Sequence, residues 1–196
     1  MNIVTRLKHV SVGLSLLMSL VLVSPTATAT PLIDITGSAG GATAYSTYTM
    51  GYQFEVANGF SVGIDGLGVF DYGSDGLSAA HKVGLWTIGG SLISSVDVPA
   101  GIAGAEASEH TAGDWVFASI ATETLTEGIY VVATTTNTSD LTWLGAAITS
   151  NVAGVSFLGQ AYGSSGPSNN VNLVFPTVIT TGPYYFGAGM LIAVPE

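Results

Sequence analysis

The chain of 196 residues contains no cysteine. Without thiols it has no disulfide bonds, no thiol nucleophile, no lipid-modified cysteine and none of the usual thiolate zinc sites. Burial of apolar side chains, alone or together with a metal ion bound by oxygen atoms, must therefore hold the folded chain together.

Positive charge is almost as scarce. Three Lys and Arg residues stand against thirteen Asp and Glu, and only Lys82 lies beyond residue 29. Residues 30–196 thus carry thirteen carboxylates and one lysine, a formal charge of −12. Such a surface repels nucleic acids, anionic membranes and phosphorylated cofactors, so we expect no nucleic acid partner. Divalent cations and neutral sugars remain compatible with it.

The first 29 residues have the three parts of a secretory signal peptide. Residues 6–8 form a basic head, Val10–Val23 is an apolar run too short to cross a bilayer, and Ala27–Ala29 supplies a small-x-small pattern. We therefore predict cleavage between Ala29 and Thr30 and export of the rest of the chain. A buried N-terminal helix of a cytosolic protein is the alternative.

Composition and periodicity predict an all-β fold. The chain is 47% hydrophobic, has 26 glycines and is only 8% charged, which is typical of a turn-rich globular protein. From Thr49 the apolar residues alternate, with Met50 to Val56 on one face, and the alternation restarts after the turn dipeptide Asn58-Gly59. This pattern predicts a hairpin. A second one is predicted around Gly89-Gly90, with Pro99 ending its second strand.

Further strands are expected along the rest of the chain. They are Trp115–Ile120, Ile129–Thr135, Leu141–Leu144, Val152–Leu158, Val171–Phe175 and Tyr184–Ile192. The apolar residues of 129–135 occupy both faces, which is typical of a central strand. We expect a flexible segment or edge strand over 30–48, a loop with room for a short helix over 101–113, and one antiparallel β-sandwich or jelly-roll domain over 49–193.

The stretch 51–133 carries a recognisable series of segments. They are GYQFEV (51–56), LGVFDYGSDGLSAAHKVGLW (67–86), SLISSVDVPAG (91–101), DWVF (114–117) and LTEGIYVVA (125–133). In this order they resemble the β-sandwich domain of unknown function found in exported proteins of exopolysaccharide-producing Gram-negative bacteria. Many of those proteins end in a PEP-CTERM sorting signal.

The C-terminal residues Val194–Glu196 resemble the opening of that sorting signal, Val-Pro-Glu-Pro. The second proline, apolar span and basic tail of the signal do not follow in this sequence; either it was trimmed at the motif or the match is accidental. The resemblance implies an outer-surface or extracellular location, with membrane contact only through such a segment. It also implies a non-enzymatic role in an extracellular matrix or biofilm.

The segment Asp71–Gly76 is the best candidate for a binding site. Asp71 and Asp75, separated by Gly73, resemble the start of a calcium-binding loop. An EF-hand is excluded because Gly73 and Lys82 occupy positions that need oxygen ligands. A calcium site built on a β-loop is one hypothesis. An Asp/Gly turn, in which the side chains bind their own backbone, is the other.

Aromatic and histidine residues supply the remaining candidates. Trp86 shares its predicted strand face with Lys82, which makes it the first candidate for an exposed platform on which a glycan stacks. Core packing is the reading that we favour, because β-sandwiches commonly bury one or two tryptophans. His81 and His110 match no metalloenzyme spacing, and we expect them to be packed or surface residues.

No catalytic residue is predicted. The sequence has no Gly-x-Ser-x-Gly nucleophile elbow, and no pair among the thirteen acids is singled out as a glycosidase pair. We expect a secreted matrix protein. A carbohydrate-binding module that holds extracellular polysaccharide is the alternative, and a glycan-active hydrolase is the weaker one. The sequence does not indicate an oligomeric state.

Overall fold

The structure, a computed structural model, describes residues 30–36, 41–43, 45, 47–140, 142–144, 147–164, 172–182 and 187–193. The predicted signal peptide and Val194–Glu196 lie outside the described residues. Throughout the described part the regular elements are β-strands, and it contains no helix. The expected all-β class is therefore confirmed.

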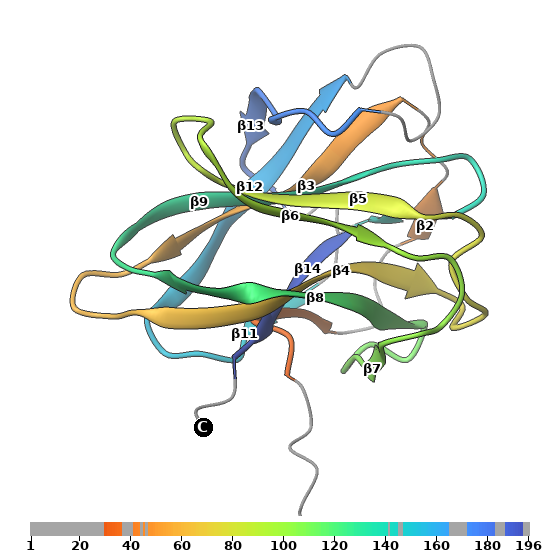
Figure 1. The fold of residues 1–196 in the computed structure, drawn as a ribbon, viewed down its shortest axis with the longest axis horizontal. Coiled ribbons are helices and arrows are strands. Elements are labelled where there is room, and N and C mark those ends of the chain that lie inside the picture. The colour runs from red at the N-terminus through yellow and green to blue at the C-terminus, as the bar shows by residue number, and fades with distance from the viewer. Residues whose placement is uncertain are drawn as a thin grey trace, which may run out of the picture.

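Two antiparallel sheets pack face to face and form a β-sandwich (Figure 1). The larger sheet has six strands in the order β13 (Val178–Thr180), β12 (Val155–Ser164), β3 (Tyr48–Val56), β9 (Gly128–Thr135), β5 (His81–Thr87) and β6 (Leu92–Val98). The smaller sheet has four strands in the order β14 (Ala188–Ile192), β4 (Val62–Tyr72), β8 (Gly113–Leu125) and β7 (Ala105–Ala107).

Two short sheets join segments that are distant in sequence. Strand β1 (Ile33–Thr36) pairs with β11 (Ala147–Ser150), and β2 (Gly41–Thr43) pairs with β10 (Thr142–Leu144). Segment 30–48 thus contains two strands within its described residues. Its first residues also extend beside β14, because the N–H of Leu32 donates a 2.7 Å hydrogen bond to the Met190 carbonyl.

The core lies between the two large sheets. Its largest fully buried side chains include Tyr52 and Phe54 of β3, Leu85 of β5, and Leu67 and Trp115 of the opposing layer. The side chains from Met50 to Val56 that were expected to share a face are all buried, while Glu55 is exposed. Period-two alternation therefore identified the core side of β3.

The second predicted hairpin is confirmed. Strands β5 and β6 pair antiparallel across the Gly89-Gly90 turn, from His81 opposite Val98 to Trp86 opposite Leu92. The expected central strand is also correct, because β9 lies between β3 and β5. Burial on both faces explains why residues 130–135 are apolar or β-branched at successive positions.

The first predicted hairpin is wrong. The Asn58-Gly59 turn forms, with Gly59 at a φ of 81° and the N–H of Phe60 bonded to the Ala57 carbonyl at 3.1 Å. However, β3 pairs with β9 and β12, whereas β4 pairs with β8 and β14. The turn therefore carries the chain from one layer to the other instead of joining two neighbours in a sheet.

Two other expectations differ from the structure. The described residues 172–175 of the strand expected over Val171–Phe175 have no strand pairing, and neither do residues 176–177; the N–H of Val174 instead donates to the Thr49 hydroxyl at 3.2 Å. Segment 101–113 contains the short strand β7 and the start of β8, with no helical turn. Segment 172–177 thus lies against the outer face of the six-stranded sheet, where Phe175 contacts Trp86.

Candidate functional site

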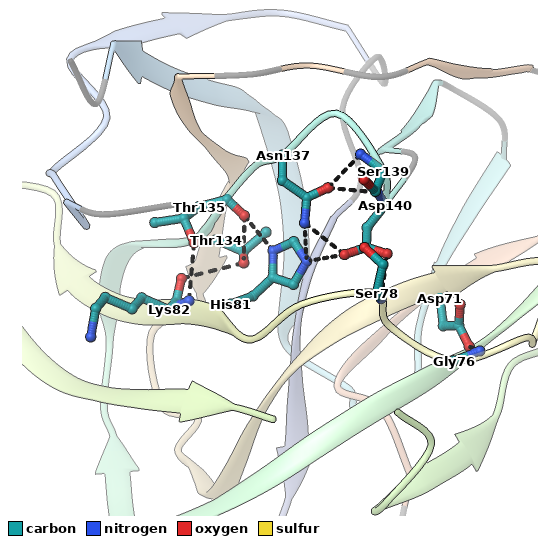
Figure 2. A network of polar contacts seen from close by, with 10 residues as sticks. All are labelled: Asp71, Gly76, Ser78, His81, Lys82, Thr134, Thr135, Asn137, Ser139 and Asp140. Atoms are coloured by element: carbon teal, nitrogen blue, oxygen red, sulfur yellow. Dashed lines mark hydrogen bonds and ion pairs between the residues drawn. The ribbon is translucent and has the colours of Figure 1, made fainter. Parts of the chain in front are cut away.

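A buried polar network surrounds His81 at the start of β5 (Figure 2). Its Nδ1 lies 2.6 Å from the carbonyl oxygen of Thr135 at the end of β9. Its Nε2 lies 2.8 Å from Oδ2 of Asp140, in the chain segment that follows β9. The side chain is 3% exposed in His81 and 11% exposed in Asp140, so the pair is largely shielded from water.

The geometry fixes one proton of the imidazole. A carbonyl oxygen can only accept a hydrogen bond, so Nδ1 carries a proton that it donates to Thr135. On the other side of the ring, Nε2 contacts the carboxylate of Asp140 and lies 3.3 Å from the side-chain amide of Asn137. Through these contacts the imidazole ties β5 to the end of β9 and to the segment after β9.

Asp140 receives more donors than His81 alone. The backbone N–H of Ser78 donates to Oδ1 at 2.7 Å, and the side-chain amide of Asn137 donates to Oδ2 at 2.7 Å. Burial alone would raise the pKa of the Asp140 carboxyl. The hydrogen bonds from His81, Ser78 and Asn137 together outweigh burial and hold that pKa well below its ordinary value.

Asp140 also lines a small acidic cavity that contains both predicted calcium ligands. The cavity has a volume of about 110 Å³ and is lined by Phe70, Asp71, Tyr72, Asp75, Leu77, Ser139 and Asp140. Asp71 is only 5% exposed. Burial raises the pKa of its carboxyl, against the hydrogen bond from Gly76, and the negative charges of Asp75 and Asp140 raise it further.

The loop itself has the form of the predicted Asp/Gly turn. Oδ2 of Asp71 accepts a 2.8 Å hydrogen bond from the N–H of Gly76, and the Asp71 carbonyl accepts one from Ser74 at 3.3 Å. Within the described ranges, no group of three or more carboxylates or histidines is arranged to hold a metal ion. Calcium binding by Asp71 and Asp75 stays a prediction.

A second buried carboxylate, Asp34 of β1, was missed by sequence reasoning. It is 2% exposed and accepts four hydrogen bonds from groups in the described part of the chain. The donors are Ile35 N at 2.8 Å, Ser108 Oγ at 2.7 Å, Glu109 N at 2.8 Å and Trp115 Nε1 at 2.8 Å. Its only sequence signal is one acid inside the apolar run from Leu32 to Ile35, which is too short for periodicity to be measured.

The hypothesis that Trp86 is an exposed platform is wrong, and the favoured reading of a buried tryptophan is correct. Its side chain is 4% exposed, and its ring lies 6.1 Å from that of Phe175 at an interplanar angle of 66°. The face shared with Lys82 is indeed the outer face of the sheet. It is covered at Trp86 because Leu173 and Phe175 lie against it, close to Gly84 and Gly90 respectively. The core-packing reading describes this residue.

The two histidines do not form a common site. His110 is 4% exposed, its Nδ1 accepts a 3.0 Å hydrogen bond from the N–H of Ala112, and its ring contacts Phe70 edge-on. His81 contacts Thr135, Asn137 and Asp140 instead. Both histidines are buried inside the protein, which agrees with the expectation of packed residues and not with that of surface residues.

Comparison with protein-family models, curated proteins and solved structures finds no match to this chain. In the described part of the chain, no helix is long and apolar enough to cross a membrane. The resemblance to exported proteins with a PEP-CTERM signal therefore stays a hypothesis that rests on the quoted segments.

Proposed function

We propose that the protein is an exported, non-enzymatic component of the cell surface or extracellular matrix, associated with exopolysaccharide. One observation carries the non-enzymatic part. The carboxylates of Asp34, which is buried, and of Asp140, which is 11% exposed, both accept hydrogen bonds from groups of the protein itself, and those groups come from segments far apart in the sequence. Carboxylates used in this way stabilise a scaffold; a catalytic acid needs an oxygen directed at a substrate.

The hydrogen bonds around Asp34 and those around Asp140 hold distant segments of the chain together, as disulfide bonds commonly do in exported domains. Asp34 joins β1 to Ser108 and to Trp115 of β8, across 74 and 81 positions of sequence. Asp140 joins the segment after β9 to His81 of β5 and to Ser78, across 59 and 62 positions. A cysteine-free chain outside the cell would gain resistance to unfolding from such cross-connections, which suits a persistent matrix component.

The proposal is tested by fractionation of the producing bacterium and by deletion of the gene. We expect the processed chain in the matrix or outer-surface fraction and a change in polysaccharide retention in the deletion strain. The purified protein should release no reducing ends from the producer's own polysaccharide. The non-enzymatic assignment would be refuted if the protein released reducing ends, if the Glu127→Gln control kept that activity, and if substitution of a different Asp or Glu abolished it.

Carbohydrate binding is the second candidate, and Tyr72 is the observation that favours it. Its side chain is 36% exposed and lines the acidic cavity with Asp75 and Ser139. An aromatic ring beside carboxylate and hydroxyl oxygens offers a stacking surface and acceptors for sugar hydroxyls. With Trp86 buried, Tyr72 takes its place as the candidate platform.

Affinity electrophoresis with the producer's polysaccharide separates the two candidates. A binding module should be retarded in the gel, and Tyr72→Ala should remove the retardation while leaving the melting temperature nearly unchanged. Phe60→Ala, which alters an aromatic side chain that is 47% exposed and does not line this cavity, is the matched control. Equal mobility of parent and variants favours the matrix role without direct glycan binding.

A further inference from the structure

An open cavity lies where the described chain starts. It has a volume of about 310 Å³ and is lined by Thr30, Pro31, Asp34, Ala107, Ser108, Glu109 and Asn151. The lining contains the carboxylates of Asp34 and Glu109 and no lysine, arginine or histidine. This cavity is distinct from the acidic one beside His81, because the two share no residue.

The backbone at this point is held firmly against the C-terminal strand. The carbonyl of Thr30 accepts a 3.0 Å hydrogen bond from Ile192 N, and the carbonyl of Pro31 accepts one of 2.8 Å from the Asn151 side chain. Pro31 also forms an antiparallel bridge with Leu191. Thr30 is therefore fixed at the cavity wall by residues on both sides of it.

Among the described residues, no cationic group donates a hydrogen bond to the carboxylate of Asp34. All four donors to its carboxylate are neutral groups, namely two backbone N–H groups, a hydroxyl and an indole. Its influence reaches the core, where burial and then the charge of Asp34 raise the pKa of Tyr52. The only lysine beyond residue 29, Lys82, pairs with Asp97 at 2.8 Å.

We propose that cleavage between Ala29 and Thr30 supplies the missing cation. The α-ammonium group of Thr30 then pairs with Glu109 and Asp34 in this cavity, so that removal of the signal peptide completes the fold. The inference rests on the proposed export of the chain. In the reaction, water adds across one peptide bond: Ala29 keeps the carboxylate, and the nitrogen of Thr30 becomes an amine that takes up a proton.

The charge exists only in the processed chain. Before cleavage the nitrogen of Thr30 is a neutral amide, and the described residues that line the cavity include two carboxylates and no basic side chain. After cleavage the new ammonium lies on a residue that lines the same cavity. Each additional residue at the N-terminus carries the ammonium up to about 3.5 Å farther along an extended chain, beyond ion-pair contact after two residues.

The test compares three N-termini on the otherwise identical chain. The first form starts at Thr30, the second keeps Thr28-Ala29 before it, and the third starts at Thr30 with an acetylated amine. We expect the first form to melt about 1 °C above the other two, since charge is removed in one and displaced in the other; the rise is small because Glu109 is exposed. Equal melting temperatures for the three forms would overturn the proposal.

A charge-neutral variant locates the partner. Glu109→Gln should lower the melting temperature of the form that starts at Thr30 and leave the acetylated form unchanged. Glu127→Gln, at an exposed carboxylate outside the cavity, should change neither form. If Glu109→Gln has the same effect in both forms, the ammonium does not pair with Glu109 and the proposal fails.

The proposed function and this inference fail in different measurements. Mass spectrometry of the chain from its natural host shows whether the mature protein starts at Thr30. A different start, or retention in the cytosol, contradicts the proposed export. The comparison of the three N-termini uses defined chains, so it decides whether the cavity binds the ammonium whatever the host does.

Discussion

The indole N–H of Trp115 donates a 2.8 Å hydrogen bond to Oδ1 of Asp34, a residue 81 positions earlier in the chain. Trp115 is fully buried in the core and Asp34 is 2% exposed. The bond therefore connects β8, in the centre of the smaller sheet, to β1, which belongs to neither large sheet. It makes a short N-terminal strand part of the core structure.

Trp115→Phe should lower the free energy of unfolding by about 1–3 kcal/mol, because it removes one donor from a buried carboxylate. Asp34→Asn should cost a similar amount, since an amide cannot accept all four hydrogen bonds. Urea denaturation of both single variants and of the double variant measures the coupling. Costs that add to within about 0.5 kcal/mol would show that the two residues do not interact.

Asp140→Asn should destabilise the protein most at neutral pH. The hydrogen bonds that lower the pKa of Asp140 favour its charged form in the folded state. Its contribution is thus fully present above the unfolded pKa of about 3.9 and is lost as the pH falls below that value. The urea midpoints of parent and variant, measured from pH 7 to pH 2, should converge at the acid end.

Asp97→Asn is the control for this pH series. The Lys82–Asp97 pair also has a 2.8 Å contact, but its side chains are 44% and 65% exposed. We expect a change close to zero at neutral pH, because exposed ion pairs contribute little to stability. A constant gap between parent and Asp140→Asn at every pH would contradict the depressed pKa.

Asp75→Asn should raise the melting temperature in EDTA by about 1–2 °C. The negative charge of Asp75 faces the buried carboxylate of Asp71 and raises its pKa, so removal of that charge relieves a repulsion. Calcium binding predicts a second result: added calcium raises the melting temperature of the parent, and both Asp71→Ala and Asp75→Asn abolish the rise. A melt of the parent that is the same in calcium and in EDTA ends the calcium hypothesis.

Trp86→Ala should act on stability and leave any glycan binding unchanged. Truncation of a buried tryptophan removes its packing and leaves a cavity, at a cost of about 3–5 kcal/mol. Phe175→Leu should cost less, because it shortens the ring that covers Trp86. Denaturant melts measure both costs. A Trp86→Ala variant that melts like the parent would show that the tryptophan is exposed in solution.

Local sequence patterns predicted the elements better than their partners. Alternation along Met50–Val56 identified a strand and its core side, and the doubly apolar segment 129–135 identified a central strand. Gly89-Gly90 and Asn58-Gly59 look alike as turn signals, yet the first joins neighbours in one sheet and the second joins two layers. A turn fixes the local reversal of the chain, and packing decides which strands then pair.

The site residues that sequence reasoning missed depend on contacts between distant segments. Asp34 and Asp140 gain their roles from donors at least 59 positions away, together with close ones such as Ile35 N and Asn137. The residues next to each aspartate in the sequence do not indicate which distant residues donate hydrogen bonds to it. Trp86 is a similar case: its strand face was inferred correctly, but the segment 172–177 that covers it comes 86 to 91 positions later in the chain.

The pairing of Thr30 with Ile192 has a consequence for the order of events during biosynthesis. The residues just before strand β1 cannot form their hydrogen bonds to β14 until β14 has been synthesised. In the same way, β3 cannot pair with β12 until β12 has been synthesised. A ribosome must therefore release almost the whole polypeptide before the sandwich closes. On the proposed route the molecule would cross the membrane as an extended thread, and the late, non-local closure would follow on the far side on the order of milliseconds to seconds.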